Sequence, residues 1–166
     1  MILDALDLKV KLDAGEHIEL RDVERARVEA TGTRLKRALG FSRLVLGQFG
    51  HRCAVCGTQL TIIEAAHIIP VHHPKGSDEV WNGLALCRNH HTLFDRRILL
   101  VDSSATVRAD EETLAVLSET GRFGGYQENI GAYRDKILQC LPLFFKKDTT
   151  LTKQMVQALK FTYDQN

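Results

Sequence analysis

Two short pairs of residues with metal-binding side chains lie in the middle of this 166-residue chain. Cys53 and Cys56 form a C-x-x-C pair, and further along Cys87 begins a C-x-x-H pair that ends at His90. Zinc in structural sites takes four thiolate or imidazole ligands in a tetrahedron, and two such pairs supply all four. The sequence therefore predicts a structural zinc with no position open for substrate. The alternative is unligated buried thiols beside a surface histidine. Cys140 has no partner at ligand spacing, and we interpret it as a core residue.

A second group of polar residues lies within the segment RNHHTLFDRR, whose sequence is typical of a helix. Neighbouring helical residues point about 100° apart, so His90 can face the zinc while His91 faces elsewhere. Asp95 is four residues after His91 and shares its face. An imidazole and a carboxylate on one face can hold a divalent cation. The alternative for Asp95 is an ion pair with Arg96, Arg97 or another nearby basic residue.

The insert between the two pairs contains further candidates. His67 lies in AHIIP, and Asn82 precedes Gly83 in WNGLALC. Taken singly, the histidine would be a core residue on an apolar strand and the asparagine a turn residue. His72 and His73 lie in a loop, where exposure to solvent is the expectation and a substrate or metal role the alternative.

Hydrophobic periodicity and turn residues predict the elements that position these side chains. A helix is expected over residues 33–49, interrupted near Gly40, with Ser42 as its N-cap, Gly50 at its end, and Leu35, Leu39, Leu46 and Phe49 on its apolar side. Strands are expected in TIIEAAHII and GLALC, and a hairpin in ILLVDSSATVRA. Further helices are expected over residues 111–118, 126–139 and 151–161. Residues 1–33 suggest two short strands and one helix.

The ordered motifs C-x-x-C, AHIIP, NGLALC and NHHTLFD resemble the HNH endonuclease family, and within it the bacterial branch with an AHIIP strand and an HHxxFD helix. The resemblance covers roughly residues 41–107. It implies an α+β fold, in which a ββα-metal (HNH) core carries a structural zinc knuckle and is flanked by helices. We accordingly expect an N-terminal extension of unknown role over residues 1–33, the nuclease core over 34–110 and a C-terminal helical extension over 111–166.

The same resemblance implies a role for each motif residue. His67 matches the general base that activates water, and Asn82 the residue that orients the catalytic loop. His91 matches a ligand of the catalytic metal, and Asp95 falls where some relatives have a second ligand. Many members carry Asp or His just before the base, where this chain has Ala66, which cannot bind a metal. The expected cation is Mg²⁺, Mn²⁺ or Ni²⁺, held by few protein ligands and by substrate phosphate.

Charge is distributed unevenly although the formal net charge is only +1. No acidic residue occurs between Glu29 and Glu64, while several basic residues do. The simplest interpretation of each basic residue is a solvated surface charge, but their grouping beside the motifs favours a surface that faces phosphate. The residues expected to contact DNA are Arg43, Arg52, Arg88 and Arg96.

Together these features predict a metal-dependent endonuclease that hydrolyses phosphodiester bonds in DNA, with restriction or phage defence as the setting that family analogy favours. One alternative is a zinc-dependent DNA-binding module without catalysis, which has no need of His67, Asn82 and His91. Another is a protein-interaction zinc domain, which the grouping of basic residues does not favour. The sequence has no long apolar run and no signal-peptide pattern, so no membrane contact and a cytoplasmic location are expected. Two interpretations of the C-terminal apolar residues stay open, a cover for the core or a two-fold homodimer.

Overall fold

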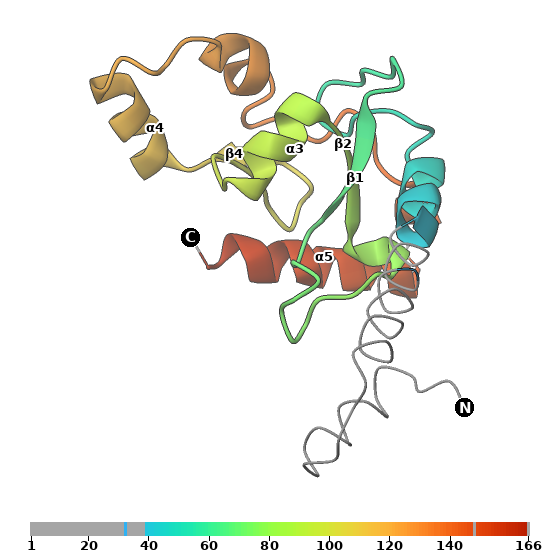
Figure 1. Ribbon diagram of the computed structural model, residues 1–166. Coiled ribbons are helices and arrows are strands. Elements are labelled where there is room, and N and C mark those ends of the chain that lie inside the picture. The colour runs from blue at the N-terminus through green and yellow to red at the C-terminus, as the bar shows by residue number, and fades with distance from the viewer. Residues whose placement is uncertain (1–31, 33–38, 148, 166) are drawn as a thin grey trace, which may run out of the picture. The chain divides into compact units, whose positions relative to one another are not determined.

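The chain divides into two compact units, residues 1–40 and residues 41–166. The computed structural model describes residue 32, residues 39–147 and residues 149–165 (Figure 1). The strands and helix expected over residues 1–33 therefore lie outside the described residues. The domain boundaries expected after residues 33 and 110 stay predictions.

A ββα unit occupies the centre of the second unit. Strand β1 (Ile63–His67) pairs antiparallel with β2 (Gly83–Cys87), so that His67 lies opposite Gly83. Helix α3 (Arg88–Asp95) follows β2 without a connecting loop (Figure 1). All five residues of β2 are buried, which explains why its sequence is a continuous apolar run. The α+β architecture expected from the sequence is confirmed.

The zinc knuckle is the segment over residues 52–57, which contains Cys53 and Cys56. The helix before it packs against the start of β2. Its backbone is helical over residues 39–48, so Gly40 does not interrupt it and the N-cap expected at Ser42 was wrong. Leu35 and the rest of residues 33–38 lie outside the described residues. Phe41, Val45 and Phe49 are buried at a spacing of four residues, one helical face. Leu39, expected on that face, is instead 62% exposed.

Close contact with this helix explains the glycine that begins β2. A Cβ atom at Gly83 would lie only 2.3 Å from Cγ2 of Val45, so any larger residue would push the helix away. The helix ends near Gly50 as expected, where a φ of +59° suits glycine.

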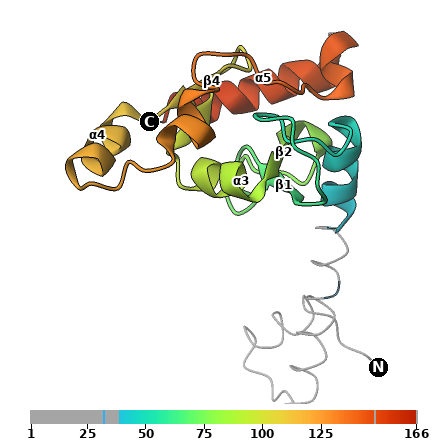
Figure 2. The same ribbon diagram turned by 90° about the horizontal axis from the view of Figure 1, so that it is seen from above.

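Helix α5 (Thr150–Tyr163) closes the core on another side of the strands (Figures 1 and 2). Met155 and Leu159 on α5 are fully buried. Each such side chain contributes about 1.5 to 3 kcal/mol relative to exposure. The helix also contacts η1 (Val80–Asn82), the 3₁₀ turn that leads into β2. The helix expected over residues 151–161 is confirmed.

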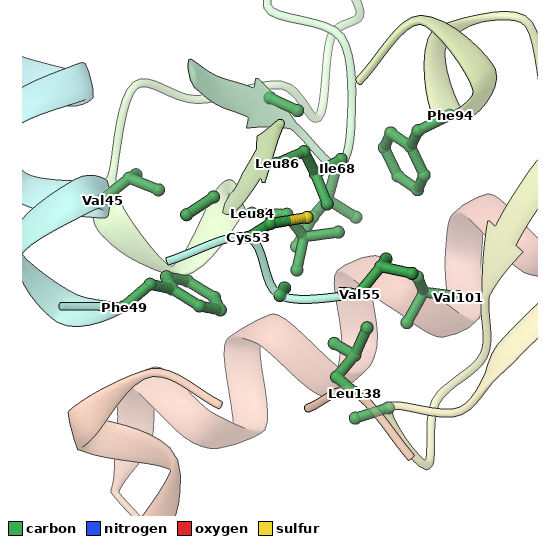
Figure 3. Close-up of a cluster of buried hydrophobic side chains, with 14 of the residues drawn as sticks. Val45, Phe49, Cys53, Val55, Ile68, Leu84, Leu86, Phe94, Val101 and Leu138 are labelled. Carbon is green, nitrogen blue, oxygen red and sulfur yellow. The ribbon is translucent and has the colours of Figure 1, made fainter. Parts of the chain in front are cut away.

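Apolar side chains from the strands, the knuckle and the helices meet in one cluster (Figure 3). Leu84 and Leu86 of β2 are fully buried there beside Cys53, whose sulfur atom is drawn among them. Cys53, the first of the predicted metal ligands, therefore lies in the core rather than on a surface loop.

A second hairpin and a helix follow α3 in the chain. β3 (Leu99–Val101) and β4 (Val107–Ala109) make the expected antiparallel hairpin. Helix α4 (Glu111–Glu119) follows, with Asp110 as its N-cap accepting a hydrogen bond from the backbone N–H of Thr113. Among the described residues no helix combines the length and apolarity needed to cross a membrane.

The helix expected over residues 126–139 was wrong beyond its first turn. Only Gln127–Gly131 is helical, as a π-helical turn. Asp135 then adopts a φ of +61°, and its N–H donates to the carbonyl of Val107. The N–H of Leu138 donates likewise to Ala105, so this segment pairs with β4 instead of continuing as a helix. A short 3₁₀ helix (Leu143–Lys147) precedes α5.

Candidate active site and metal centre

The four predicted zinc ligands converge although they come from two separate segments. The sulfur atoms of Cys53, Cys56 and Cys87 and a ring nitrogen of His90 all lie within 4.8 Å of one another. Sγ of Cys56 and Sγ of Cys87 are 3.9 Å apart, close to the roughly 3.8 Å expected across a tetrahedron with Zn–S bonds of about 2.3 Å. Nδ1 of His90 is 3.1 Å from Sγ of Cys87 and 3.5 Å from Sγ of Cys53. The donor set and its spacing fit a structural zinc.

The second nitrogen of His90 fixes its tautomer. Nε2 lies 2.9 Å from the carbonyl oxygen of Asn129, which can only accept, so Nε2 carries the proton. Burial lowers the pKa of His90, which favours the neutral ring. Nδ1 is then unprotonated, and its lone pair faces the cysteines, which is the arrangement that a zinc-bound histidine needs.

The surroundings of the three thiols shift their pKa values in different directions. Burial raises the pKa of Cys53 to about 12, and burial also raises the pKa of Cys87. Burial opposes ionisation of Cys56 as well, but hydrogen bonds from Thr58 outweigh it and lower the pKa of Cys56. Zinc binds thiolates, so the cluster must release protons as it takes up the metal.

His91 points away from the zinc cluster and meets two carboxylates. Its Nδ1 lies 2.9 Å from Oε2 of Glu64 on β1, and its Nε2 lies 3.3 Å from Oδ2 of Asp95. The structure thus brings together the two predicted ligands on α3 and adds Glu64. The ligand roles of His91 and Asp95 themselves stay predictions.

Glu64 is the residue at this site that sequence reasoning missed. Oε1 of Glu64 accepts a hydrogen bond of 3.0 Å from Nε of Arg88, while Oε2 meets His91. The bond to His91 lowers the pKa of Glu64 most, and Arg88 lowers it further. Glu64 is the one acidic residue of β1, three residues before His67, and that position was the available signal.

His67, the predicted base, lies at the end of β1 with its ring held from two directions. Its Nε2 is 3.0 Å from Oδ1 of Asp78. The ring of Phe41 stacks on it with centroids 4.0 Å apart and planes 6° from parallel. The side chain remains 25% exposed, so solvent and substrate can still reach it.

Asn82 is fully buried and ties together the loop that follows His67. Its Oδ1 accepts from the N–H of Ile69 at 2.9 Å, and its Nδ2 donates to the carbonyl oxygens of Ile69 and Ser77, both at 2.8 Å. The side chain therefore satisfies backbone groups at both ends of the loop, which is consistent with the predicted orienting role.

The loop histidines differ in their surroundings. Nδ1 of His73 accepts a hydrogen bond from the N–H of Lys75, and its ring lies 5.3 Å from that of Phe161 on α5. His72 is exposed. His73 therefore helps dock the loop on α5, and among the described residues neither histidine makes a hydrogen bond to the groups around His67 or His91.

The four arginines predicted to contact DNA all have exposed side chains: Arg43, Arg52, Arg88 and Arg96. The side chain of Arg88 donates a hydrogen bond to Glu64. Exposure leaves all four available to phosphate, and their DNA contacts stay predictions.

Comparison with known proteins addresses the family. The model of the HNH endonuclease family matches residues 53–102. This segment is an HNH endonuclease segment. The HNH segment contains the four cysteine and histidine ligands together with His67, Asn82, His91 and Asp95, so the resemblance stated above is confirmed for that part of the chain.

Two further comparisons concern solved structures and curated proteins. A solved structure titled "Modification dependent TagI restriction endonuclease" is similar, with 30% identity and a TM-score of 0.37. The match covers 42% of this chain and 27% of that one, so the chain spans about a quarter of that protein. No curated protein matches the chain.

Proposed function

We propose that the chain is a metal-dependent endonuclease that hydrolyses phosphodiester bonds in DNA. The observation that carries this proposal is the pairing of His91 Nε2 with Asp95 Oδ2 at 3.3 Å on the HNH segment. Two ligands of one cation at about 2.1 Å lie about 3 Å apart, so these atoms fit neighbouring positions around Mg²⁺ or Mn²⁺. Ni²⁺ suits the imidazole equally well.

Glu64 has a supporting role in this proposal. If His91 binds the cation through Nε2, its Nδ1 must carry the proton, and Oε2 of Glu64 lies 2.9 Å away to accept it. Carboxylates that hold a metal-bound histidine in this way fix its tautomer and orientation. Arg88, bonded to the other oxygen of Glu64, has its remaining N–H groups exposed for a substrate phosphate.

The division of chemical labour follows from the residue types. His67 removes a proton from the attacking water, because a neutral imidazole suits that task at cellular pH. A bound cation supplies charge stabilisation at the phosphate and at the leaving oxygen. His91 and Asp95 hold it, and Asn82 keeps the loop beside His67 in place. The zinc at Cys53 and its partners maintains the frame.

We assign restriction or phage defence as the setting and the cytoplasm as the location, on family analogy and the sequence expectations alone. The second candidate is a zinc-dependent DNA-binding module without catalysis. It would need the zinc cluster and the exposed arginines but not the arrangement around His91.

Plasmid cleavage separates the two candidates. Supercoiled plasmid is incubated with the full chain and Mg²⁺, Mn²⁺ or Ni²⁺, with and without EDTA. We expect nicked or linear DNA with the cation and none with EDTA, and we expect His67→Ala to reduce turnover by about 10² or more while DNA binding persists. Plasmid that is bound but left uncut by the wild-type chain with every cation would favour the binding module.

A further inference from the structure

Asp78 lies in the loop that connects the two strands of the ββα unit, and it contacts His67 directly. Its Oδ1 is 3.0 Å from Nε2 of the imidazole. The two side chains are 33% and 25% exposed, so the contact is partly shielded from water. Nothing in the motif pattern singled out this aspartate, which is eleven residues after His67.

Contacts within the loop hold Asp78 beside His67. Asn82 Nδ2 holds the carbonyl of Ser77, the residue immediately before Asp78, at 2.8 Å. A Cβ atom at Gly76 would lie 2.1 Å from the carbonyl oxygen of Pro70, so the loop closes on itself at a point where only glycine fits. Asp78 thus sits on an ordered loop whose two ends are joined by a buried side chain.

The contact determines which nitrogen of His67 carries the proton. An ionised carboxylate can only accept hydrogen bonds, so the Nε2 beside Asp78 must be the protonated nitrogen. A neutral imidazole has one N–H, which leaves a lone pair on Nδ1. The stacked ring of Phe41 further restricts how the imidazole can turn.

We propose that Asp78 is a positioning residue that holds His67 in the tautomer with Nδ1 free to act as the base. The inference rests on the proposed function, since it assigns a partner to the proposed base. Nδ1 takes one proton from water as the water oxygen bonds to phosphorus and the bond to the sugar oxygen breaks. The sugar oxygen leaves with the electron pair of that bond and takes a proton from solvent. The imidazolium that results has N–H groups on both nitrogens, and the Asp78 carboxylate balances its charge.

The test combines a spectroscopic signature with kinetics on the full, zinc-loaded chain. In ¹H–¹⁵N spectra of the wild type, we expect His67 to show a hydrogen-bonded Nε2–H proton that exchanges slowly with water. Asp78→Ala should lose this signal and reduce kcat about 10- to 100-fold with little change in KM, because binding is untouched. Asp78→Glu should restore part of both. Glu79→Gln is the matched control, because it removes the neighbouring exposed charge, and it should keep both.

Different outcomes identify different failures. A wild type that cleaves DNA without a protected Nε2–H, or an Asp78→Ala variant that keeps the signal and the rate, would overturn the role of Asp78 alone. A wild type that shows the protected proton but cuts no DNA with any cation would overturn the proposed function and with it the catalytic meaning of the contact. Unchanged zinc content and melting temperature in Asp78→Ala exclude misfolding as the cause of a loss.

Discussion

At the scale of single residues, acidic side chains organise the basic ones on this molecule. Glu64 is hydrogen-bonded to both Arg88 and His91. Asp78 is hydrogen-bonded to His67, and Asp102 accepts a hydrogen bond from Arg108. None of the three is part of the motifs that identify the chain. Each contact depends on how strands, loops and helices fold together, and none follows from helical spacing within one element.

Asp102 offers a clean prediction because Arg108 contacts two carboxylates of different exposure. Burial opposes ionisation of Asp102, but hydrogen bonds from Ser104 and Arg108 outweigh it and lower the pKa of Asp102. Its side chain is 14% exposed, whereas that of Asp135, the second partner of Arg108, is 61% exposed. Asp102→Asn should therefore destabilise the protein by about 1 to 2 kcal/mol at neutral pH. Asp135→Asn should cost less than about 0.5 kcal/mol.

The pH dependence has a definite sign. A carboxyl group whose pKa is lowered by folding stabilises the native state above its unfolded pKa, and this contribution disappears as pH falls through the folded value. Denaturant unfolding of both variants and the wild type should therefore show the Asp102→Asn deficit shrinking below about pH 4. Equal effects of the two variants at pH 7, or a deficit that persists unchanged at pH 3, would contradict this account.

How far the site could be predicted depends on the kind of contact. The pair His91 and Asp95 follows from helical spacing within eight residues, and the cysteine pairs follow from ligand spacing. The partners Glu64 and Asp78 depend on strand–helix packing and on loop closure, which no local period encodes. For the same reason the helix expected over residues 126–139 was wrong, since its backbone bonds go to β4.

At the scale of elements, the zinc knuckle connects the helix over residues 41–48 to the ββα unit. Cys53 and Cys56 lie in the knuckle, while Cys87 ends β2 and His90 lies on α3. A metal bound here would fasten the knuckle to the first turn of the helix that carries His91. Loss of the metal should therefore affect both stability and the active site.

Metal analysis tests this coupling. Protein purified without added zinc should hold close to one zinc per chain, and Cys53→Ala should lose the metal and unfold or aggregate. Cys140→Ala is the matched control, because Cys140 is a free thiol outside the cluster and its loss should leave the zinc content unchanged. Fully folded protein without zinc would refute the structural role.

At the scale of the whole molecule, the C-terminal helix bears on assembly. Met155, Ala158 and Leu159 of α5 are buried within the chain itself, which supports their role as a cover for the core. Ile137 and Leu143 are 63% and 59% exposed, and Tyr163 at the end of α5 is 38% exposed, so a partner could reach all three. A two-fold homodimer stays a proposal. With one active site per chain, cutting both DNA strands would need either two protomers or two successive nicks.

Two hydrogen bonds link Thr162 of α5 to neighbouring segments. Its hydroxyl donates to the carbonyl of Ile68, in the loop after His67, and its carbonyl accepts from Nη2 of Arg97, just after α3. The C-terminal helix therefore supports both sides of the proposed active site. This connection explains why a region outside the matched HNH segment belongs to the same folded unit.

The central claim is that His91 holds one cation and that His67 is the base. The most direct test is to measure how cleavage by His91→Ala and by His67→Ala depends on manganese. Single-turnover rates are measured from low to saturating Mn²⁺ alongside the wild type. We expect both variants to be slower by about 10² or more at low Mn²⁺. High Mn²⁺ should partly restore His91→Ala, which loses only a ligand, and should leave His67→Ala slow because no cation replaces its base. A His67→Ala variant that cleaves at the wild-type rate, or the same manganese response in both variants, would contradict the account.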